Sequence, residues 1–304
     1  MDQQERRPKQ SQLVTVHQLV KEGHEALKDA NKQNAMIDAE LLALHALGYT
    51  RLERILNSNL GVSEQDQKTY RDYISKRCSG IPLQYIINEQ EFMGLPFYVD
   101  PNVLIPRQDT ETLVEVLIEK SKKQSFNKIV EVGVGSGCIS ISLAKFLPSS
   151  RITGIDISDK ALEIAKRNAK KNQVEDRIQW SCGDLLNGYQ SDEKVDLVVS
   201  NPPYITSKDC TELDEDVKEH EPMLALDGGE DGLRFYRDIT KQAKNHLRQG
   251  GMLAYEIGYN QSKDVRDIME ENGFVQIEEI KDLAYKDRIV LGILDDGLTK
   301  QTKR

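Results

Sequence analysis

The sequence predicts an α/β protein in which a seven-stranded Rossmann-like domain follows a small helical bundle and a β-hairpin linker. Short apolar runs typical of buried strands alternate with amphipathic stretches of helical period over residues 107–294. Residues 1–82 show helical periodicity with almost no strand pattern, and a β-like pattern at 83–106 joins the two regions. A length of 304 residues is sufficient for two domains.

The first region, residues 1–82, is predicted to form a helical domain. One apolar face repeats at helical spacing, with Thr15 placed to cap its start, through Val16, Leu19, Val20, Gly23 and Leu27. Further helices are expected at 35–46, 51–57 and 64–76. Periodicity alone does not separate a stabilising appendage from a module that docks a macromolecular substrate.

The second region, residues 83–106, is predicted to be a β-hairpin linker. Strand-like runs occupy 84–87, 91–93 and 97–99, and the last two flank a turn at Gly94-Leu95-Pro96. Beyond it, Asp109 is expected to cap a helix that carries Leu113, Val116 and Leu117.

The third region, residues 107–294, is predicted to hold a mostly parallel, doubly wound sheet. Helical stretches separate most of the expected strands, which lie at 128–132, 151–156, 178–182, 195–200, 251–257, 275–280 and 288–294. The last two leave little room for a crossover helix, so a terminal antiparallel hairpin is expected. Residues 295–304 are expected to be a frayed tail.

Composition favours some classes of protein over others. Forty-one Lys and Arg face 50 Asp and Glu, and a net charge of −9 gives no overall attraction to a phosphate backbone. Residues 1–12 lack the apolar core of a secretory signal, and the apolar run 289–294 is far shorter than the ~20 residues of a membrane span. The four Cys and five His lack metal-ligand spacing. We therefore expect a cytoplasmic protein without a metal, a membrane anchor or direct nucleic-acid binding.

A glycine-rich loop follows the first strand of the third region. The sequence reads Glu131-Val132-Gly133-Val134-Gly135-Ser136-Gly137, and an apolar helix begins at once with Cys138. Glycines let a ligand approach the backbone, and free amides at a helix start favour polar or anionic groups. A dinucleotide fingerprint, G-x-G-x-x-G, would need Gly or Ala at position 138, where this sequence has Cys138. The G-x-G-x-G spacing therefore disfavours NAD.

Two carboxylates end the next two strands. Asp156 lies about 20 residues beyond the glycines, where a carboxylate can accept both hydroxyl protons of an adenosine ribose. A solvated strand-end carboxylate is the alternative. Ser158 is expected to cap the helix that follows. Asp184 could accept from an adenine amino group with Leu185 over the ring, although an Asp after a Gly is commonly a turn residue.

The fourth strand runs into Asn201-Pro202-Pro203-Tyr204. A Pro-Pro pair could merely end a strand, but this motif stands where open α/β sheets bind ligands. The nitrogen of an amide or an exocyclic amine is a poor nucleophile, because its lone pair is delocalised. The Asn201 side-chain carbonyl and the Pro202 main-chain carbonyl can each accept one NH2 proton, and Tyr204 offers a flat face for stacking. The motif therefore predicts methyl transfer to a planar nitrogen.

Taken together, these motifs resemble those of the release factor glutamine methyltransferases, the HemK/PrmC family. The resemblance extends over nearly the whole chain, including Ile105-Pro106-Arg107-Gln108-Asp109-Thr110-Glu111, Glu221-Pro222 and residues 225–233. It implies a class I methyltransferase that uses S-adenosylmethionine and methylates N5 of the glutamine in the Gly-Gly-Gln loop of peptide chain release factors. It also implies that the helical domain docks this substrate, and we expect a monomer.

The resemblance assigns roles to individual residues. Asn201, Pro202, Pro203 and Tyr204 would form the catalytic motif, and Arg107 would lie near the site. S-adenosylmethionine would be bound by Glu131, Gly133, Val134, Gly135, Ser136, Gly137, Asp156, Asp184, Leu185 and Asn201. This sequence departs from the family at four positions. Glu131 and Val134 stand where the family often has Asp and Thr. Leu185 stands where an aromatic residue is frequent, and Gln108 where Pro is usual. These departures affect the expected cofactor affinity and leave the amide clamp intact.

Two rival functions are weighed against this one. An adenine-N6 DNA methyltransferase also uses an Asn-Pro-Pro-Tyr clamp, but it needs a basic surface to hold DNA. The acidic balance of the chain counts against it. A cofactor-binding scaffold that activates a partner would have no use for two aligned acceptors at the sheet edge.

Overall fold

The computed structural model describes residues 13–189 and 191–295. The expectations for residues 1–12 and for 296–304 therefore lie outside the described residues. The chain forms two compact units, and the division falls between Ile87 and Asn88. We call them the N-terminal unit and the C-terminal unit.

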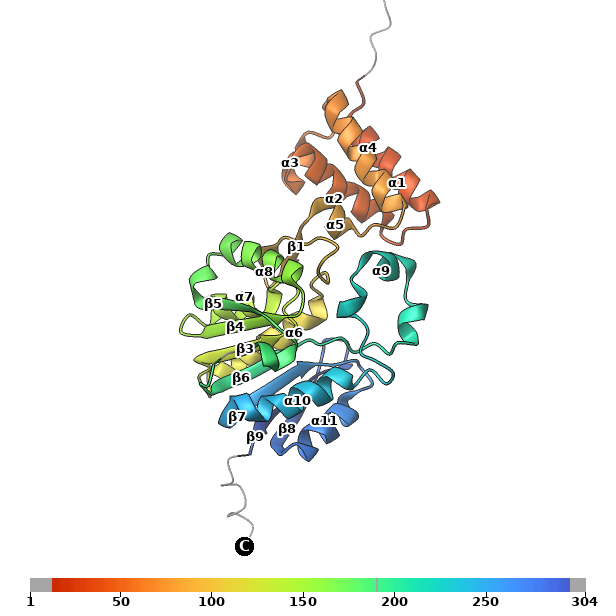
Figure 1. Cartoon of the computed structure of the whole chain (residues 1–304). Helices are drawn as coiled ribbons and strands as arrows, with labels where there is room; N and C mark the ends of the chain where they lie inside the picture. Colours follow the sequence, from red (N-terminus) through yellow and green to blue (C-terminus); the bar gives the residue numbers. More distant parts are fainter. Residues whose placement is uncertain (1–12, 190, 296–304) are drawn as a thin grey trace, which may run out of the picture. The chain divides into compact units, whose positions relative to one another are not determined.

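The N-terminal unit is helical, as expected, and packs around its own apolar core (Figure 1). Its helices are α1 Val16–Asp29, α2 Ala35–Leu47, α3 Arg51–Leu56, α4 Glu64–Cys78 and α5 Leu83–Ile87. Thr15 caps α1 in a capping box with Gln18, which satisfies backbone donors at the helix start. Leu19, Leu27 and Tyr70 are fully buried in the core.

Helix α5 replaces the strand expected at 84–87, so that prediction is wrong. The main-chain carbonyl of Pro82 accepts from the N–H groups of Tyr85 and Ile86 at 3.0 and 3.2 Å. Proline suits a helix start, because its fixed φ is already helical and its missing N–H is not needed there. A short apolar run fits a buried helix as well as a strand, and periodicity cannot separate the two.

The C-terminal unit begins with the expected hairpin, but its turn lies at Met93-Gly94 instead of Gly94-Leu95-Pro96, and its second strand begins two residues earlier than predicted. Strands β1 Gln90–Phe92 and β2 Leu95–Phe97 pair antiparallel. Met93 and Gly94 form the two-residue turn with φ of 54° and 70°, as a type I′ turn requires. The rings of Phe92 and Phe97 are buried edge to face, with centroids 6.0 Å apart.

A sheet of seven strands, counted within the described residues, forms the centre of this unit in the order β5-β4-β3-β6-β7-β9-β8 (Figure 1). The strands are β3 Lys128–Val132, β4 Arg151–Asp156, β5 Ile178–Cys182, β6 Val195–Ser200, β7 Leu247–Glu256, β8 Phe274–Lys281 and β9 Asp287–Leu294. Strands β3 to β7 pair in parallel, and β9 pairs antiparallel with β7 and β8. The predicted doubly wound sheet and terminal hairpin are therefore confirmed.

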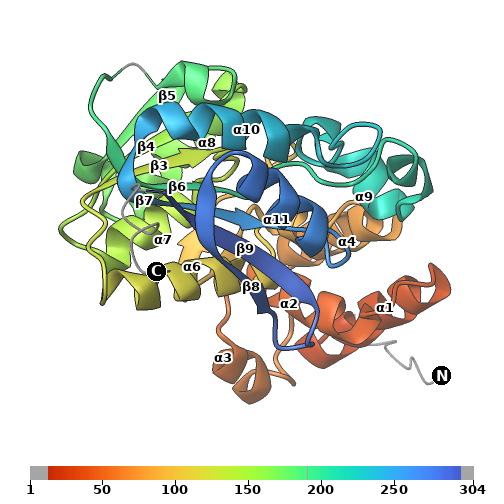
Figure 2. The same ribbon diagram turned by 90° about the horizontal axis from the view of Figure 1, so that it is seen from below.

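Helices cover both faces of the sheet (Figure 2). One face packs mainly against α6 Gln108–Ser121, α7 Cys138–Phe146 and α8 Asp159–Lys171. The other face packs against α10 Arg234–His246 and α11 Ser262–Glu271. Shorter helical segments are α9 Glu215–His220 and the 3-10 turns Glu175–Arg177, Leu185–Gly188, Asp209–Glu212 and Met223–Ala225. Because both faces are covered, the central strands are apolar along their length, which is why the sequence revealed them.

The start of α6 differs from the prediction. Arg107, not Asp109, is the N-cap residue, and Asp109 lies in the first turn of the helix. The Asp109 carboxylate instead binds Arg288 at 3.0 Å. An acidic residue in the first turn also complements the helix dipole.

Among the helices that the structure describes, none is both long enough and apolar enough to cross a bilayer.

Candidate active site

The site lies at the carboxyl ends of the central strands. Strands β4 and β6 flank β3 on opposite sides, so successive crossovers from β3 and from β5 run in opposite directions. This topological switch point is where open α/β sheets bind their ligands. The loops after β3 and β6 border a cavity of about 390 Å³ there. Of the predicted site residues, it is lined by Glu131, Gly133, Val134, Gly135, Ser136, Asp156, Asp184, Leu185, Asn201, Pro202 and Pro203.

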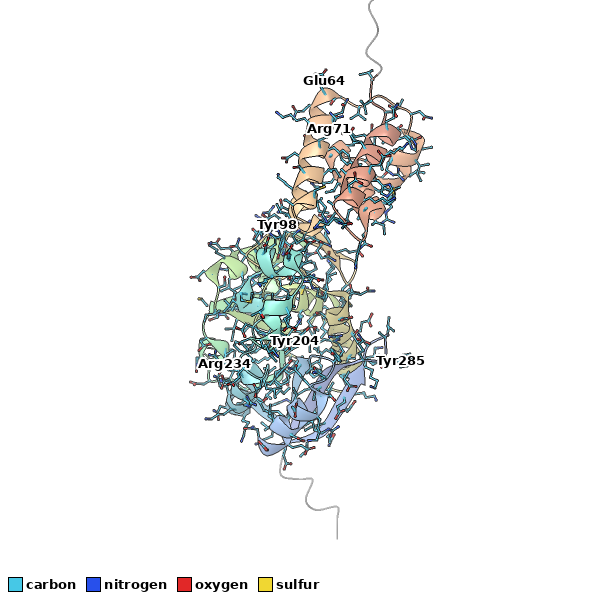
Figure 3. All side chains as sticks on the ribbon, turned by 90° about the vertical axis from the view of Figure 1, so that its right-hand side faces the viewer. Glu64, Arg71, Tyr98, Tyr204, Arg234 and Tyr285 are labelled. Atoms are coloured by element: carbon cyan, nitrogen blue, oxygen red, sulfur yellow. The ribbon has the colours of Figure 1, made fainter. Side chains whose placement is uncertain are left out.

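Gly137 and Tyr204 are the two predicted site residues that do not line the cavity, among those the structure describes. A Cβ on Gly137 would approach Ile141 Cδ1 to 2.9 Å, so this glycine serves the packing of α7. Tyr204 packs against the core on the α10 side of the sheet, and burial raises its pKa to about 12. Figure 3 shows it within the C-terminal unit, whereas Tyr285 projects from the surface. A stacking role for Tyr204 stays a prediction.

The glycine loop is shaped by left-handed backbone. Gly133, Gly135 and Gly137 have φ of 77°, 53° and 84°, which other residues rarely adopt. The loop turns back so that Gly135 N–H donates to Asp156 Oδ2 at 2.9 Å. Ser158 N–H donates to Asp156 Oδ1 at 2.9 Å, and Ser158 caps α8 as expected. The Asp156 carboxylate is thereby fixed at the cavity wall.

The two oxygens of Asp156 keep capacity for further donors, because each carboxylate oxygen can accept about two hydrogen bonds. Burial raises the pKa of this carboxyl, and the backbone donors at Gly135 and Ser158 oppose the rise. Vicinal ribose hydroxyls are donors of the required kind, so the position fits the predicted role.

Glu131 is a buried carboxyl at the end of β3. It is 1% exposed, and its Oε2 accepts from both the N–H and the hydroxyl of Ser140. Burial raises its pKa to about 8. Its Oε1 is buried without a hydrogen-bond partner in the described ranges 13–189 and 191–295. A buried acceptor in the cavity wall is costly unless a donor meets it, so Glu131 fits a ligand that carries an ammonium group.

Asp184 and Leu185 border the cavity after β5. Leu185 has φ of 53°, an uncommon value for a non-glycine residue, and the 3-10 turn Leu185–Gly188 begins there. The main-chain N–H of Leu186 donates to Gln242 Oε1 of α10 at 2.9 Å, which holds this turn in place. The turn brings both residues to the cavity wall that Asp156 also forms.

Asn201 stands one residue beyond the end of β6. Its Nδ2 donates to the hydroxyl of Thr110 on α6 at 3.2 Å. Glu256, at the end of the neighbouring strand β7, is 1% exposed; Thr110 and Asn201 lie near enough to its carboxyl to lower its pKa, and its Oε2 is buried without a hydrogen-bond partner among the described residues. Burial is the larger effect and raises that pKa to about 7. The amide nitrogen of Asn201 is therefore engaged on the protein side.

Neither Thr110 nor Glu256 has a role in the sequence-based prediction. Thr110 belongs to the segment 105–111 that resembles the family. A glutamate that ends the apolar run of β7 was the available signal for Glu256, since acidic residues rarely end fully buried. The predicted proximity of Arg107 does hold: it lines the cavity, and its Nη2 donates to both Glu221 carboxylate oxygens at 2.6 and 2.7 Å.

The sheet topology, the glycine loop and the strand-end carboxylate define a class I methyltransferase that depends on S-adenosylmethionine. The Methyltransferase small domain family matches residues 105–220, and the PrmC N-terminal domain family matches residues 18–87. The crystal structure of a methyltransferase from Pyrococcus furiosus aligns with 73% of this chain and 99% of its own, with TM-score 0.52 and 18% identity. That likeness shows the fold.

Curated relatives identify the family. A release factor glutamine methyltransferase of Clostridium acetobutylicum is 42% identical over 89% of this chain and 95% of its own length. One of Clostridium botulinum is 40% identical over 90% of this chain and 96% of its own. The chain belongs to the release factor glutamine methyltransferase family.

Proposed function

We propose that the chain transfers a methyl group from S-adenosylmethionine to the side-chain N5 of the glutamine in the Gly-Gly-Gln loop of peptide chain release factors. The family supports the class of substrate. The observation that carries the chemistry is the engagement of Asn201 Nδ2 by Thr110, at 3.2 Å, beside the cavity. It leaves the Asn201 carbonyl oxygen as an acceptor for an incoming NH2 group.

The glycine-loop side of the cavity holds the cofactor in this proposal. Asp156 accepts from the ribose hydroxyls, and Glu131 Oε1 accepts from the methionine ammonium. The loop residues Val134, Ser136 and Gly137 support this wall with Gly133 and Gly135, and the adenine lies at Asp184 and Leu185. When bound, S-adenosylmethionine supplies an electrophilic methyl group on its sulfonium. These assignments agree with a cavity that has a buried, unpaired acceptor at Glu131, within the part of the chain that the structure describes.

The Asn201 side of the cavity holds the target amide. Asn201 Oδ1 and the Pro202 carbonyl each accept one amide proton, which fixes the plane of the NH2 group and directs its nitrogen toward the cofactor. The prolines Pro202 and Pro203 restrict the backbone, so little entropy is lost when the acceptors are used. The rate then derives from positioning and from preorganised dipoles. Tyr204 completes the motif, and in this proposal it offers its ring to the planar amide while the rest of the side chain packs against the core on the α10 side.

The N-terminal unit is the docking module in this proposal. Four apolar side chains on and after α3 are each more than half exposed: Leu52, Ile55, Leu56 and Leu60. We call them the α3 patch. An exposed apolar patch of this kind is typical of a protein-binding surface. In this proposal residues 1–82 dock the substrate, residues 83–106 link the two domains, and residues 107–294 transfer the methyl group.

Mass spectrometry of a methylation reaction tests this function. Full-length release factor is incubated with the enzyme and methyl-labelled S-adenosylmethionine, and one labelled methyl group is expected on the glutamine of the Gly-Gly-Gln peptide. A release factor in which that glutamine is replaced by alanine is the control and should remain unlabelled. Label on duplex DNA with none on release factor would overturn the proposal in favour of adenine-N6 methylation.

A further inference from the structure

Glu256 is a buried carboxyl that the proposed chemistry does not use. It ends β7 directly after Tyr255, which pairs with Ser200 at the end of β6, so Glu256 and Asn201 leave adjacent parallel strands at the same level. Glu256 does not itself line the cavity, within the described residues, whereas Thr110 and Asn201 do. A carboxylate is costly to bury, so its position beside the Asn201 side chain calls for a reason.

The hydrogen bonds around Thr110 have a direction. Asn201 Nδ2 donates to the Thr110 oxygen, so the single hydroxyl proton of Thr110 is free to donate onward. An ionised carboxylate only accepts, and Glu256 Oε2 is buried without a hydrogen-bond partner among the described residues, so Glu256 is the natural acceptor for the Thr110 proton. With Glu256 protonated, the carboxylic acid becomes a donor and the chain can reverse. A reversed chain turns the Asn201 amide so that NH2 instead of oxygen faces the cavity.

We propose that Glu256 is a positioning residue that, through Thr110, holds the Asn201 amide with Oδ1 toward the target nitrogen. The inference rests on the proposed function, because it assumes that Asn201 Oδ1 accepts the target amide proton. Asparagine alone cannot choose between its two nearly isosteric orientations, and the wrong one presents a donor to a donor. The carboxylate removes that ambiguity.

The charged and polar groups around Glu256 determine the pH at which its carboxyl ionises. Its neighbours are Asp109 and Thr110 on α6, Cys138 on α7, Tyr204 and Asn201 after β6, Tyr236 on α10 and Arg288 on β9. Burial raises the pKa of Glu256 to about 7, Asp109 adds to the rise, and Thr110, Arg288 and Asn201 oppose it. Arg288 is itself held by Asp109 at 3.0 Å and Asp282 at 3.2 Å. The ionised, correctly oriented state therefore grows as pH rises through neutrality.

Steady-state kinetics of four variants test the proposal. Glu256→Ala and Thr110→Val each interrupt the chain, so we expect kcat to fall about tenfold, with the KM for release factor and the Kd for S-adenosylmethionine unchanged. Because the two residues act in one chain, the double variant should lose little more than either single one. Thr110→Ser keeps the hydroxyl and should restore kcat.

The pH profile separates positioning from mere support of the fold. Glu256→Gln cannot ionise, and its NH2 end can face Thr110 as a donor, so its kcat at pH 8 should fall toward that of Glu256→Ala and lose its dependence on pH through neutrality. Asp196→Asn is the matched control, because Asp196 is a largely buried carboxylate that binds Arg248 at 2.6 Å near the start of β6. This control should keep the acidic limb. Wild-type kcat in folded Glu256→Ala, or an acidic limb that persists in Glu256→Gln, would overturn the proposal.

A measurement without turnover distinguishes failure of this inference from failure of the proposed function. The side-chain 15N–1H signals of Asn201, assigned by their loss in Asn201→Ala, should shift with pH in wild type and not in Glu256→Gln. A titrating signal in a protein that does not methylate release factor would support the hydrogen-bond chain and reject the function. A signal insensitive to pH in an active enzyme would reject the chain alone.

Discussion

The two sides of the cavity are built in different ways. The glycine-loop side comprises Glu131, Gly133, Gly135 and Asp156, and backbone N–H groups hold its Asp156 carboxylate. The Asn201 side comprises Asn201 and Pro202, and side chains hold its amide. Thr110 on α6 and Glu256 on β7 supply that support. The first side is local in sequence, whereas the second is assembled from three distant segments.

This difference has a functional consequence. Backbone geometry shapes a surface for a ligand that must bind in one pose, so changes on the glycine-loop side should appear in cofactor affinity. A side-chain network sets the direction of one acceptor, and that direction matters most as the nitrogen reacts. Changes on the Asn201 side should therefore appear in kcat. Substitutions on each side of the cavity should therefore affect different kinetic constants.

The largest effect is expected for Asn201→Ala. The substitution removes one of two acceptors that orient the target amide, and loss of one preorganised hydrogen-bonding group commonly costs about 10²–10³ in kcat. The Kd for S-adenosylmethionine should change by less than about threefold, since the glycine-loop side is untouched. Single-turnover kinetics and calorimetry measure the two quantities. A variant with undiminished turnover would show that Asn201 does not hold the target.

The converse behaviour is expected for Asp156→Asn. The neutral amide loses charge-assisted hydrogen bonds to the ribose, and its NH2 end faces a backbone N–H, so the Kd for S-adenosylmethionine should rise about 10–100-fold. At saturating cofactor, kcat should stay within a few-fold of wild type. A fall in saturating kcat with an unchanged Kd would place Asp156 in the chemical step and contradict the separation of the two sides.

The sequence predicted the parts of the fold in which local pattern and tertiary burial agree. Strands β3, β4 and β6 lie inside the sheet and are largely buried, and β5 at the sheet edge is bounded by turn residues, so the ends of all four agree with the prediction to the residue. The sequence-based prediction was wrong where the local residues suit two different structures. An apolar run after Pro82 became α5, and Asp109 became a partner of Arg288 instead of a cap.

The site shows the same limit. Glu131 to Asp156 form one strand-turn-helix-strand segment, so their meeting follows from the motif itself. Thr110 and Asn201 are 91 positions apart, and Arg107 and Glu221 are 114 apart. Which side chain on one element faces another depends on helix rotation and strand register, and a single sequence does not encode those relations in any local pattern.

Within the glycine-loop side, Gly137→Ala and Gly135→Ala should differ in stability. Both residues have positive φ, so each substitution adds roughly 1 kcal/mol of backbone strain. A Cβ at Gly137 would also lie 2.9 Å from Ile141 and 3.1 Å from Ala165, whereas at Gly135 no described atom lies within 4 Å. We expect a total loss of about 2 kcal/mol or more for Gly137→Ala and about half that for Gly135→Ala. Urea denaturation measures both, and equal losses would contradict the packing role of Gly137.

Glu131→Gln should make the protein more stable at pH 8 and bind S-adenosylmethionine less tightly. Burial raises the pKa of Glu131 from 4.5 to about 8, so the folded state holds a proton that the unfolded state releases. Its contribution to stability is therefore full below pH 4.5 and is lost as pH rises through about 8. At pH 8, Glu131→Gln without cofactor should be more stable than wild type by about 1–2 kcal/mol, while its Kd for S-adenosylmethionine rises.

Urea denaturation of wild type and Glu131→Gln at pH 6 and pH 8 checks this prediction. Glu256 contributes a slope of the same sign, because burial also raises its pKa, but it is present in both proteins and cancels in the difference. A difference in the free energy of unfolding that does not change with pH would mean that Glu131 titrates normally.

The smallest effect is expected far from the chemistry, in the α3 patch. Leu56 is 72% exposed, so Leu56→Ser should leave the fold intact and raise the KM for full-length release factor about 3–10-fold through lost apolar contact. The KM for an isolated Gly-Gly-Gln peptide should not change, because the peptide cannot reach a separate docking surface. Leu283→Ser on the C-terminal unit is the matched control, since Leu283 is 94% exposed and lies outside the patch. Equal effects of Leu56→Ser on protein and peptide would remove docking from the N-terminal unit and leave substrate selection to the cavity alone.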